Sequence, residues 1–151
     1  MIEIEYRRTG PYVEHGRENR EGVDLAVVSR ADLRWYYFLC DLSFTIGEVH
    51  LTPPWSWTPV FDFLWSMKGV LEHLERGEHS TVGFTENAEL IEFAPDDGKV
   101  RVSCTYAAAE AACELADLKD SWLGFRQAVL TELSGKYPRL AANPVLAELR
   151  L

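Results

Sequence analysis

The hydrophobic positions between residues 58 and 77 recur with a helical period. Apolar side chains follow one another at steps of three or four residues, which places them on one stripe of a helix: Val60, Leu64, Met67, Leu71 and Leu74. Thr58 followed by Pro59 is typical of a helix start, and Gly77 is typical of a position just past a helix end. The pattern predicts an amphipathic helix here, and we expect the rest of the chain to pack against its apolar stripe.

A second helical stripe lies near the C-terminus. It consists of Leu118, Trp122, Phe125, Val129 and Leu133, which again follow at steps of three and four. This spacing predicts a long helix that begins near Leu115 and ends near Gly135. Asn143 and Pro144 then predict the start of a short terminal helix.

Alternating apolar and polar residues predict strands in most of the remaining chain. The predicted strands cover residues 2–6, 23–28, 35–46, 49–51, 79–85, 89–94 and 99–106. Residues 14–22 are expected to form a mobile loop, and residues 31–34 and 86–88 to form turns. Asp97 followed by Gly98 is a strong signal for a hairpin. The alanine-rich residues 107–114 fit either a helix or a short strand.

The order of these elements predicts one α+β domain that covers residues 1–151. We expect a twisted antiparallel sheet of about five to seven strands, with the two long helices packed on one face and a short C-terminal helix. Inward-facing apolar residues and outward-facing polar residues in the later strands favour this antiparallel arrangement.

Four aromatic side chains near the first helix lie outside its apolar stripe. At about 100° per residue, Phe61 and Trp65 project together to one side of the stripe. Trp55 and Trp57 precede the helix and could stack against them. The cluster fits either a small satellite core beneath the loop at Pro53 or an exposed aromatic binding patch.

Charge is distributed unevenly along the chain. The formal net charge is −9, and residues 41–120 hold 15 of the 24 acidic residues but 5 of the 15 basic ones. This field repels nucleic acid and anionic membranes and attracts a basic partner, although solubility alone would also account for it. No apolar run approaches the ~20 residues that span a bilayer, and the N-terminus lacks an apolar signal segment, so we expect a cytoplasmic protein.

The sequence contains no recognisable catalytic, phosphate-binding or metal-binding motif. Cys40, Cys104 and Cys113 form no CxxC pair and indicate neither a disulfide framework nor a thiolate zinc site. His73 and His79 are not spaced as metal ligands on one helix. Asp62 is the one acid whose pKa burial could raise. We therefore expect no catalytic residue, no metal and no cofactor.

Three segments carry a resemblance: residues 54–65 (PWSWTPVFDFLW), 84–87 (FTEN) and 137–149 (YPRLAANPVLAEL). In these segments the chain resembles a family of small bacterial proteins of unknown function. Its size, acidity and layout are loosely similar to those of immunity proteins, which neutralise toxins in the cytoplasm. The resemblance implies a binding role and assigns no role to individual residues.

These observations lead to two hypotheses. The first is a non-catalytic cytoplasmic binding protein, immunity-like, that presents an acidic surface to a basic protein partner such as a toxin. Its candidate partner surface consists of Trp55, Trp57, Phe61, Trp65, Glu72, Glu75 and Glu78. The alternative is a small-molecule binder or enzyme with an aromatic cleft formed by Trp35, Tyr37, Trp55, Trp57 and Trp65. The spare aromatic residues could also form a homodimer interface.

Overall fold

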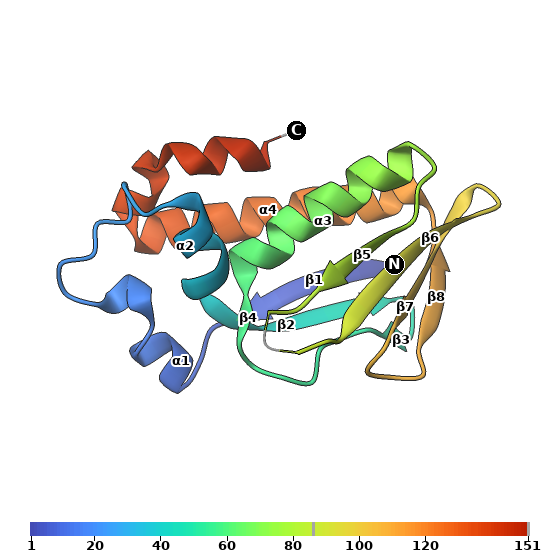
Figure 1. Ribbon diagram of the computed structural model, residues 1–151, viewed down its shortest axis with the longest axis horizontal. Coiled ribbons are helices and arrows are strands. Elements are labelled where there is room, and N and C mark those ends of the chain that lie inside the picture. Colours follow the sequence, from blue (N-terminus) through green and yellow to red (C-terminus); the bar gives the residue numbers. More distant parts are fainter. Residues whose placement is uncertain (86, 151) are drawn as a thin grey trace.

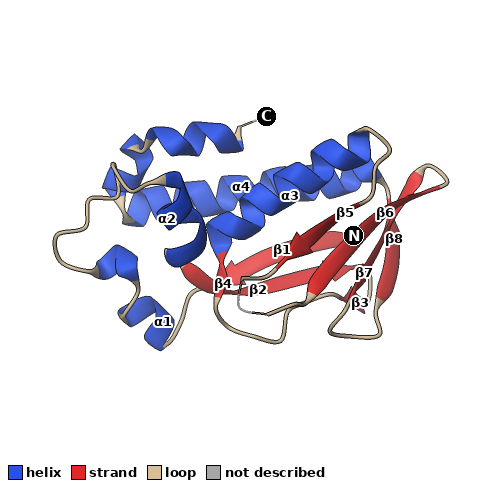
Figure 2. Cartoon of the chain, viewed as in Figure 1, coloured by secondary structure: helices blue, strands red, loops and turns tan. Residues whose placement is uncertain are grey.

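The computed structural model describes residues 1–85 and 87–150. Two antiparallel sheets, each of four strands, lie beneath two long helices that run side by side (Figure 1). Figure 2 shows that the short helices gather at one end of the molecule, beyond the ends of the strands. The α+β class and the antiparallel sheets are as predicted.

The first sheet is built around one long strand. It contains β1 (Ile2–Arg7), β2 (Leu39–Ile46), β3 (Val49–His50) and β4 (Thr58–Pro59). β1 pairs over its whole length with residues 41–46 of β2, and β3 and β4 pair with the two ends of β2. Alternate residues of β2 are buried, as one expects for a strand with one face on the core.

The second sheet is a meander in chain order. It contains β5 (Ser80–Gly83), β6 (Leu90–Asp96), β7 (Lys99–Cys104) and β8 (Glu110–Cys113). Asp97 and Gly98 both have positive φ, at 51° and 84°, and they form the predicted hairpin turn between β6 and β7. Residues 107–114 fitted either a helix or a short strand, and β8 within them shows that a strand forms. The predicted turn at 86–88 includes residue 86, which lies outside the described residues.

The two predicted long helices are present as α3 (Val60–Glu75) and α4 (Leu115–Lys136), and both apolar stripes are buried. The N–H groups of Gly77 and Glu78 donate to the carbonyls of Leu74 and His73 at 3.0 and 2.9 Å, which is the hydrogen-bond pattern of a glycine-terminated helix. The indole of Trp122 donates to the carbonyl of Leu64 at 3.1 Å and ties α4 to α3. No described helix is long and apolar enough to cross a membrane.

The prediction of one continuous sheet is wrong. In the described residues, no strand pairing joins β1–β4 to β5–β8, so the two sheets meet through side chains. Phe44 of β2 stacks on Phe93 of β6, with ring centroids 6.5 Å apart and planes inclined by 20°. Because both sheets turn their apolar faces to the same helices, one hydrophobic cluster runs through both layers.

The N-terminal third departs most from the prediction. Residues 23–28 form no strand; instead, the carbonyls of Leu25 and Val28 accept hydrogen bonds from the Asn143 side chain at 2.9 and 3.0 Å. The predicted turn at 31–34 belongs to a helix, α2 (Arg30–Tyr36). The Ser29 hydroxyl caps this helix by accepting from the N–H of Asp32 at 3.1 Å.

The predicted strand at 35–46 therefore begins only at Leu39. Residues 14–22, expected to be a loop, begin with the last residue of α1 (Pro11–Glu14) and include a 3-10 helix, η1 (Arg17–Asn19). The terminal segment forms two further 3-10 helices, η2 (Pro138–Ala142) and η3 (Pro144–Leu149). As predicted, Asn143 caps the second of them, accepting from the N–H of Val145 at 3.0 Å.

Thr58 does not cap α3. Thr58 lies in β4, where it pairs with Cys40 of β2. Its buried hydroxyl has no hydrogen-bond partner among the described residues. α3 begins one residue after Pro59, which stands at the N-cap position without a side-chain hydrogen bond. The strand pairing with β2 holds Thr58 in the sheet and so prevents the capping geometry.

Candidate functional site

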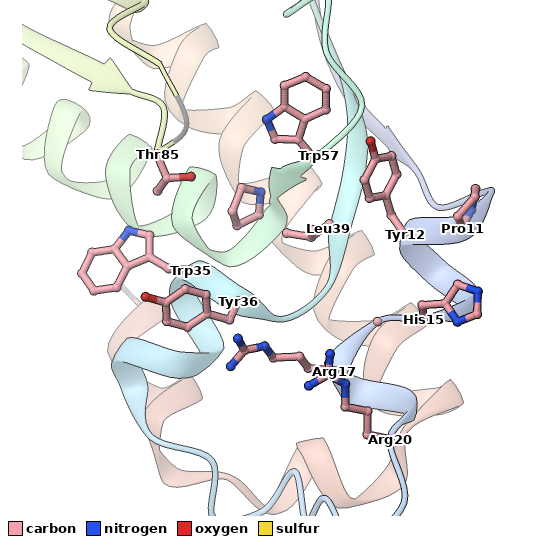
Figure 3. A pocket seen from close by; sticks show the side chains of 12 residues that line it. Pro11, Tyr12, His15, Arg17, Arg20, Trp35, Tyr36, Leu39, Trp57 and Thr85 are labelled. Carbon is pink, nitrogen blue, oxygen red and sulfur yellow. The ribbon is translucent and has the colours of Figure 1, made fainter.

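A pocket of about 720 Å³ opens at the end of the first sheet, where the short helices gather. We call it the aromatic pocket. Aromatic and basic side chains dominate its lining: Tyr12, Trp35, Tyr36, Trp57, Arg17 and Arg20. Figure 3 shows Trp35 and Tyr36 on one side, Tyr12 and His15 on the other, and Leu39 between them. Its volume lies within the range of small-molecule sites, about 300–1,000 Å³.

One wall of the aromatic pocket is the N-terminal arm, which we define as residues 10–20. A buried carboxylate fixes this arm to the core. Glu18 forms an ion pair with Arg8 and also accepts the backbone N–H of Phe38 at 3.0 Å. The side chains of Arg8 and Glu18 are 7% and 1% exposed, so the pair is largely shielded from water. The arm is therefore an ordered wall.

The last residue of η1 adds a second attachment. Asn19 accepts a hydrogen bond from the Tyr137 hydroxyl at 2.8 Å and donates to the carbonyl of Val13 at 2.6 Å. The Tyr137 ring in turn packs edge-on against Phe38, with centroids 5.2 Å apart. The arm thus contacts the first sheet and the end of α4 together.

The opposite wall depends on an unusual backbone conformation. Phe38 has φ of 55°, which costs a non-glycine residue on the order of 1–3 kcal/mol. This kink lies between α2 and β2. It directs Tyr37 and Phe38 into the core while leaving Trp35 and Tyr36 outside, 37% and 51% exposed. The hydrogen bond from the Phe38 N–H to the Glu18 carboxylate connects this wall to the arm.

Trp35 is supported from α3. The Arg34 guanidinium lies 5.0 Å from the centroid of the Trp35 ring and also binds Asp62 at 2.7 Å. Burial raises the pKa of Asp62, and the hydrogen bond from Arg34 opposes that rise. Asp62 therefore has a supporting role, because it fixes the arginine that covers an aromatic wall of the pocket.

Trp57 enters the pocket because Trp55 is held elsewhere. Trp55 packs edge-on against Phe84 and Tyr106 of the second sheet, with centroids 4.8 and 5.2 Å apart. The Tyr106 hydroxyl also donates to the carbonyl of Leu51 at 2.5 Å. Two residues further along this anchored loop, Trp57 lies against Tyr12 at 6.4 Å between centroids. The sequence left open that Trp55 and Trp57 stack against Phe61 and Trp65. Instead, Trp55 packs on Phe84 and Tyr106, Trp57 lies against Tyr12, and Phe61 and Trp65 contact each other.

Two arginines give the pocket a positive charge within an acidic chain. Arg17 lies over the Tyr36 ring, with its guanidinium carbon 4.7 Å from the centroid. Neither Arg17 nor Arg20 forms an ion pair with any described acidic residue, and no described residue that lines the pocket is acidic. The site is therefore suited to an anion with a flat, apolar part.

The candidate partner surface is divided by the fold. Phe61 is fully buried and Trp65 is 6% exposed, so both belong to the core and present almost no surface. The three candidate glutamates are exposed, and each is paired with a base. Lys68 binds Glu72 at 2.9 Å, Lys119 binds Glu75 at 3.2 Å and Arg76 binds Glu78 at 2.7 Å.

The predicted aromatic cleft is only partly assembled. Trp35 and Trp57 line the aromatic pocket, but Tyr37 and Trp65 are buried and Trp55 packs on the second sheet. No pattern in the sequence marked Tyr12, Tyr36 or the two arginines as lining residues of a pocket. The available signal was the four arginines within residues 7–20 of an acidic chain.

Cys40, Cys113 and His73 lie outside the lining of the aromatic pocket. Burial raises the pKa of Cys40 to about 12 and that of Cys113 to about 11, so both thiols stay protonated near neutral pH. His73 uses Nδ1 for a contact of 2.8 Å with the carbonyl of Gly69. The described residues contain no group of three His, Cys, Asp or Glu side chains that could hold a metal ion.

Comparisons of the chain with protein-family models, with curated proteins and with solved structures give no match. The arrangement of the site itself must therefore carry the functional argument.

Proposed function

We propose that the protein is a binding protein whose ligand is a small anion that carries a flat ring. The ligand would occupy the aromatic pocket, with its ring against the aromatic side chains and its charge on the arginines. One observation carries the proposal: of the five large hydrophobic side chains that are exposed in the described structure, Tyr12, Trp35 and Tyr36 converge on this one pocket. Exposed aromatic residues that cluster around polar groups are characteristic of binding sites.

The charge arrangement supports an anion as the ligand. Arg17 and Arg20 lack carboxylate partners among the described residues. Arg7, Arg126 and Arg150 lack them too, but none of these three lines the aromatic pocket. A guanidinium stacked on an aromatic ring keeps its in-plane N–H groups free to bind an oxyanion. The pocket is also supported by a strained residue, Phe38, a feature that is often found beside binding sites.

The acidic-surface hypothesis has less support. Glu72, Glu75 and Glu78 each lie beside a base, so the local field that would attract a basic protein is weakened. Two of its aromatic members, Phe61 and Trp65, are in the core. A cytoplasmic location and an immunity-like role stay predictions of the sequence.

Intrinsic tryptophan fluorescence and thermal shift test the proposal directly. The panel contains aromatic carboxylates, nucleoside monophosphates and uncharged compounds with the same rings. We expect charged members to quench fluorescence and raise Tm, and uncharged members to do so weakly. Tyr36→Ala should abolish the response, whereas Val27→Ala, which removes an exposed apolar side chain outside the pocket, should leave it intact. The proposal would be contradicted if Tyr36→Ala and Val27→Ala showed the same fluorescence quenching and the same change in Tm with every ligand.

A further inference from the structure

The arm places two arginines at one side of the aromatic pocket. Arg17 begins η1 and Arg20 follows its last residue, so both come from a single turn of chain. Figure 3 shows both guanidinium groups turned toward the space that the aromatic side chains enclose, while His15 lies at the rim. The anchored Glu18 between them fixes the position of this turn.

Two unpaired guanidinium groups match a doubly charged ligand group better than a singly charged one. A phosphate monoester carries about −1.5 to −2 charges near neutral pH and has three strong acceptor oxygens, whereas a carboxylate carries one charge. Each guanidinium can donate two parallel N–H bonds to phosphate oxygens. The cluster therefore has the charge and the donors that a phosphate group requires.

The aromatic pocket as a whole is too large to be filled by a phosphate group alone. Its volume of about 720 Å³ leaves room for a ring system beside the arginines. Trp35 and Tyr36 face this space from one side, and Tyr12 and Trp57 face it from the other (Figure 3). Aromatic side chains of this kind stack on nucleobases, because every base has a flat π face.

We propose that the aromatic pocket binds a nucleoside phosphate, with the phosphate on Arg17 and Arg20 and the base stacked against Trp35 or Trp57. This inference rests on the proposed function and names its ligand class. A monomer fits better than a polynucleotide, since the net charge of −9 repels an extended polyanion. The local pair of arginines compensates for a single phosphate group only.

Calorimetric titration distinguishes this ligand class from other anions. The probes are the four common ribonucleoside monophosphates, their nucleosides, inorganic phosphate and an aromatic carboxylate. We expect at least one monophosphate to bind roughly tenfold or more tightly than its own nucleoside, since phosphate supplies charge-assisted hydrogen bonds. Binding should weaken as salt concentration rises.

Variants separate the two parts of the site. The double variant Arg17→Gln, Arg20→Gln should weaken monophosphate binding by roughly tenfold or more and leave nucleoside binding within about twofold. The matched control is Arg7→Gln, Arg150→Gln, which removes the same charge from two exposed arginines that do not line the pocket. Trp57→Ala should weaken the binding of both nucleotide and nucleoside, because it removes a stacking surface.

The outcomes have distinct meanings. If the aromatic carboxylate binds as tightly as every monophosphate, the phosphate assignment is overturned and the proposed function stands. Binding of inorganic phosphate that equals that of the monophosphates, with no effect of Trp57→Ala, would overturn the nucleotide assignment as well. If no probe binds, or if neither the arginine nor the tryptophan variants alter binding, both proposals fail.

Discussion

The buried ion pair that anchors the N-terminal arm leads to a quantitative prediction. Glu18→Gln keeps the size of the side chain and an acceptor for the Phe38 N–H, but it removes the charge opposite Arg8. The Arg8 side chain is only 7% exposed, and its Nε has no hydrogen-bond partner among the described residues. An uncompensated buried charge costs about 3–5 kcal/mol, and the retained acceptor places this variant near the lower value.

Urea denaturation provides the measurement. We expect the unfolding free energy of Glu18→Gln to fall by about 3 kcal/mol with little change in m value, and Tm to fall by roughly 6–12 °C for a chain of this length. If the arm detaches before the core unfolds, part of this loss appears as faster amide exchange confined to residues 10–20. Hydrogen exchange with mass spectrometry detects that release.

The exposed ion pair between Arg30 and Glu148 is the matched control. Its side chains are 46% and 47% exposed and lie 2.6 Å apart. Glu148→Gln should therefore change stability by less than about 1 kcal/mol. The reasoning is refuted if Glu18→Gln costs no more than Glu148→Gln and the arm amides exchange at the wild-type rate.

Two further predictions concern residues that support the pocket. Gly16→Ala should detach the arm and weaken ligand binding, because an added β-carbon would lie 2.7 Å from Cδ of Glu18; amide exchange and titration check this, and Gly135→Ala, where a β-carbon meets nothing within 4 Å, is the control. Asp62→Asn should remove a pH dependence of stability. Burial raises the pKa of Asp62, so the protonated form is favoured in the folded state, and the wild type should lose stability relative to the variant as pH rises above the ordinary aspartate pKa of about 3.9. Urea unfolding between pH 4 and 7 measures the difference, and a difference that grows in favour of the wild type would contradict the assignment.

Local patterns predicted the long elements well. The stripes of α3 and α4, the glycine that ends α3 and the Asp97-Gly98 turn all depend on interactions among residues close in the chain. Such interactions are largely independent of the rest of the fold, so their residue patterns are sufficient to place them. Prediction failed where a distant partner decided the conformation. Residues 23–28 have the composition of a strand, but Asn143 takes the carbonyls that a neighbouring strand would have used.

The candidate site was predicted in part. Trp35 and Trp57 were expected to line a cleft, and they do line the pocket. The expectation that Tyr37 lines the cleft was wrong, because the kink at Phe38 directs Tyr37 into the core and leaves Tyr36 outside. The sequence did not predict that Arg17 and Arg20 line a pocket. No motif surrounds these arginines, and only the folded chain brings them next to the aromatic residues.

The sequence by itself determined the α+β class, the two amphipathic helices and the antiparallel meander, because hydrophobic periodicity and turn residues act locally. Only the tertiary structure decided that the strands divide into two sheets and that an arm, a kinked helix end and a tryptophan loop meet around one pocket. That meeting depends on contacts such as Glu18 with Phe38, which are 20 residues apart, and Tyr137 with Asn19, which are 118 apart. The contact between Glu18 and Phe38 is buried, which strengthens it, and burial is a property of the folded chain.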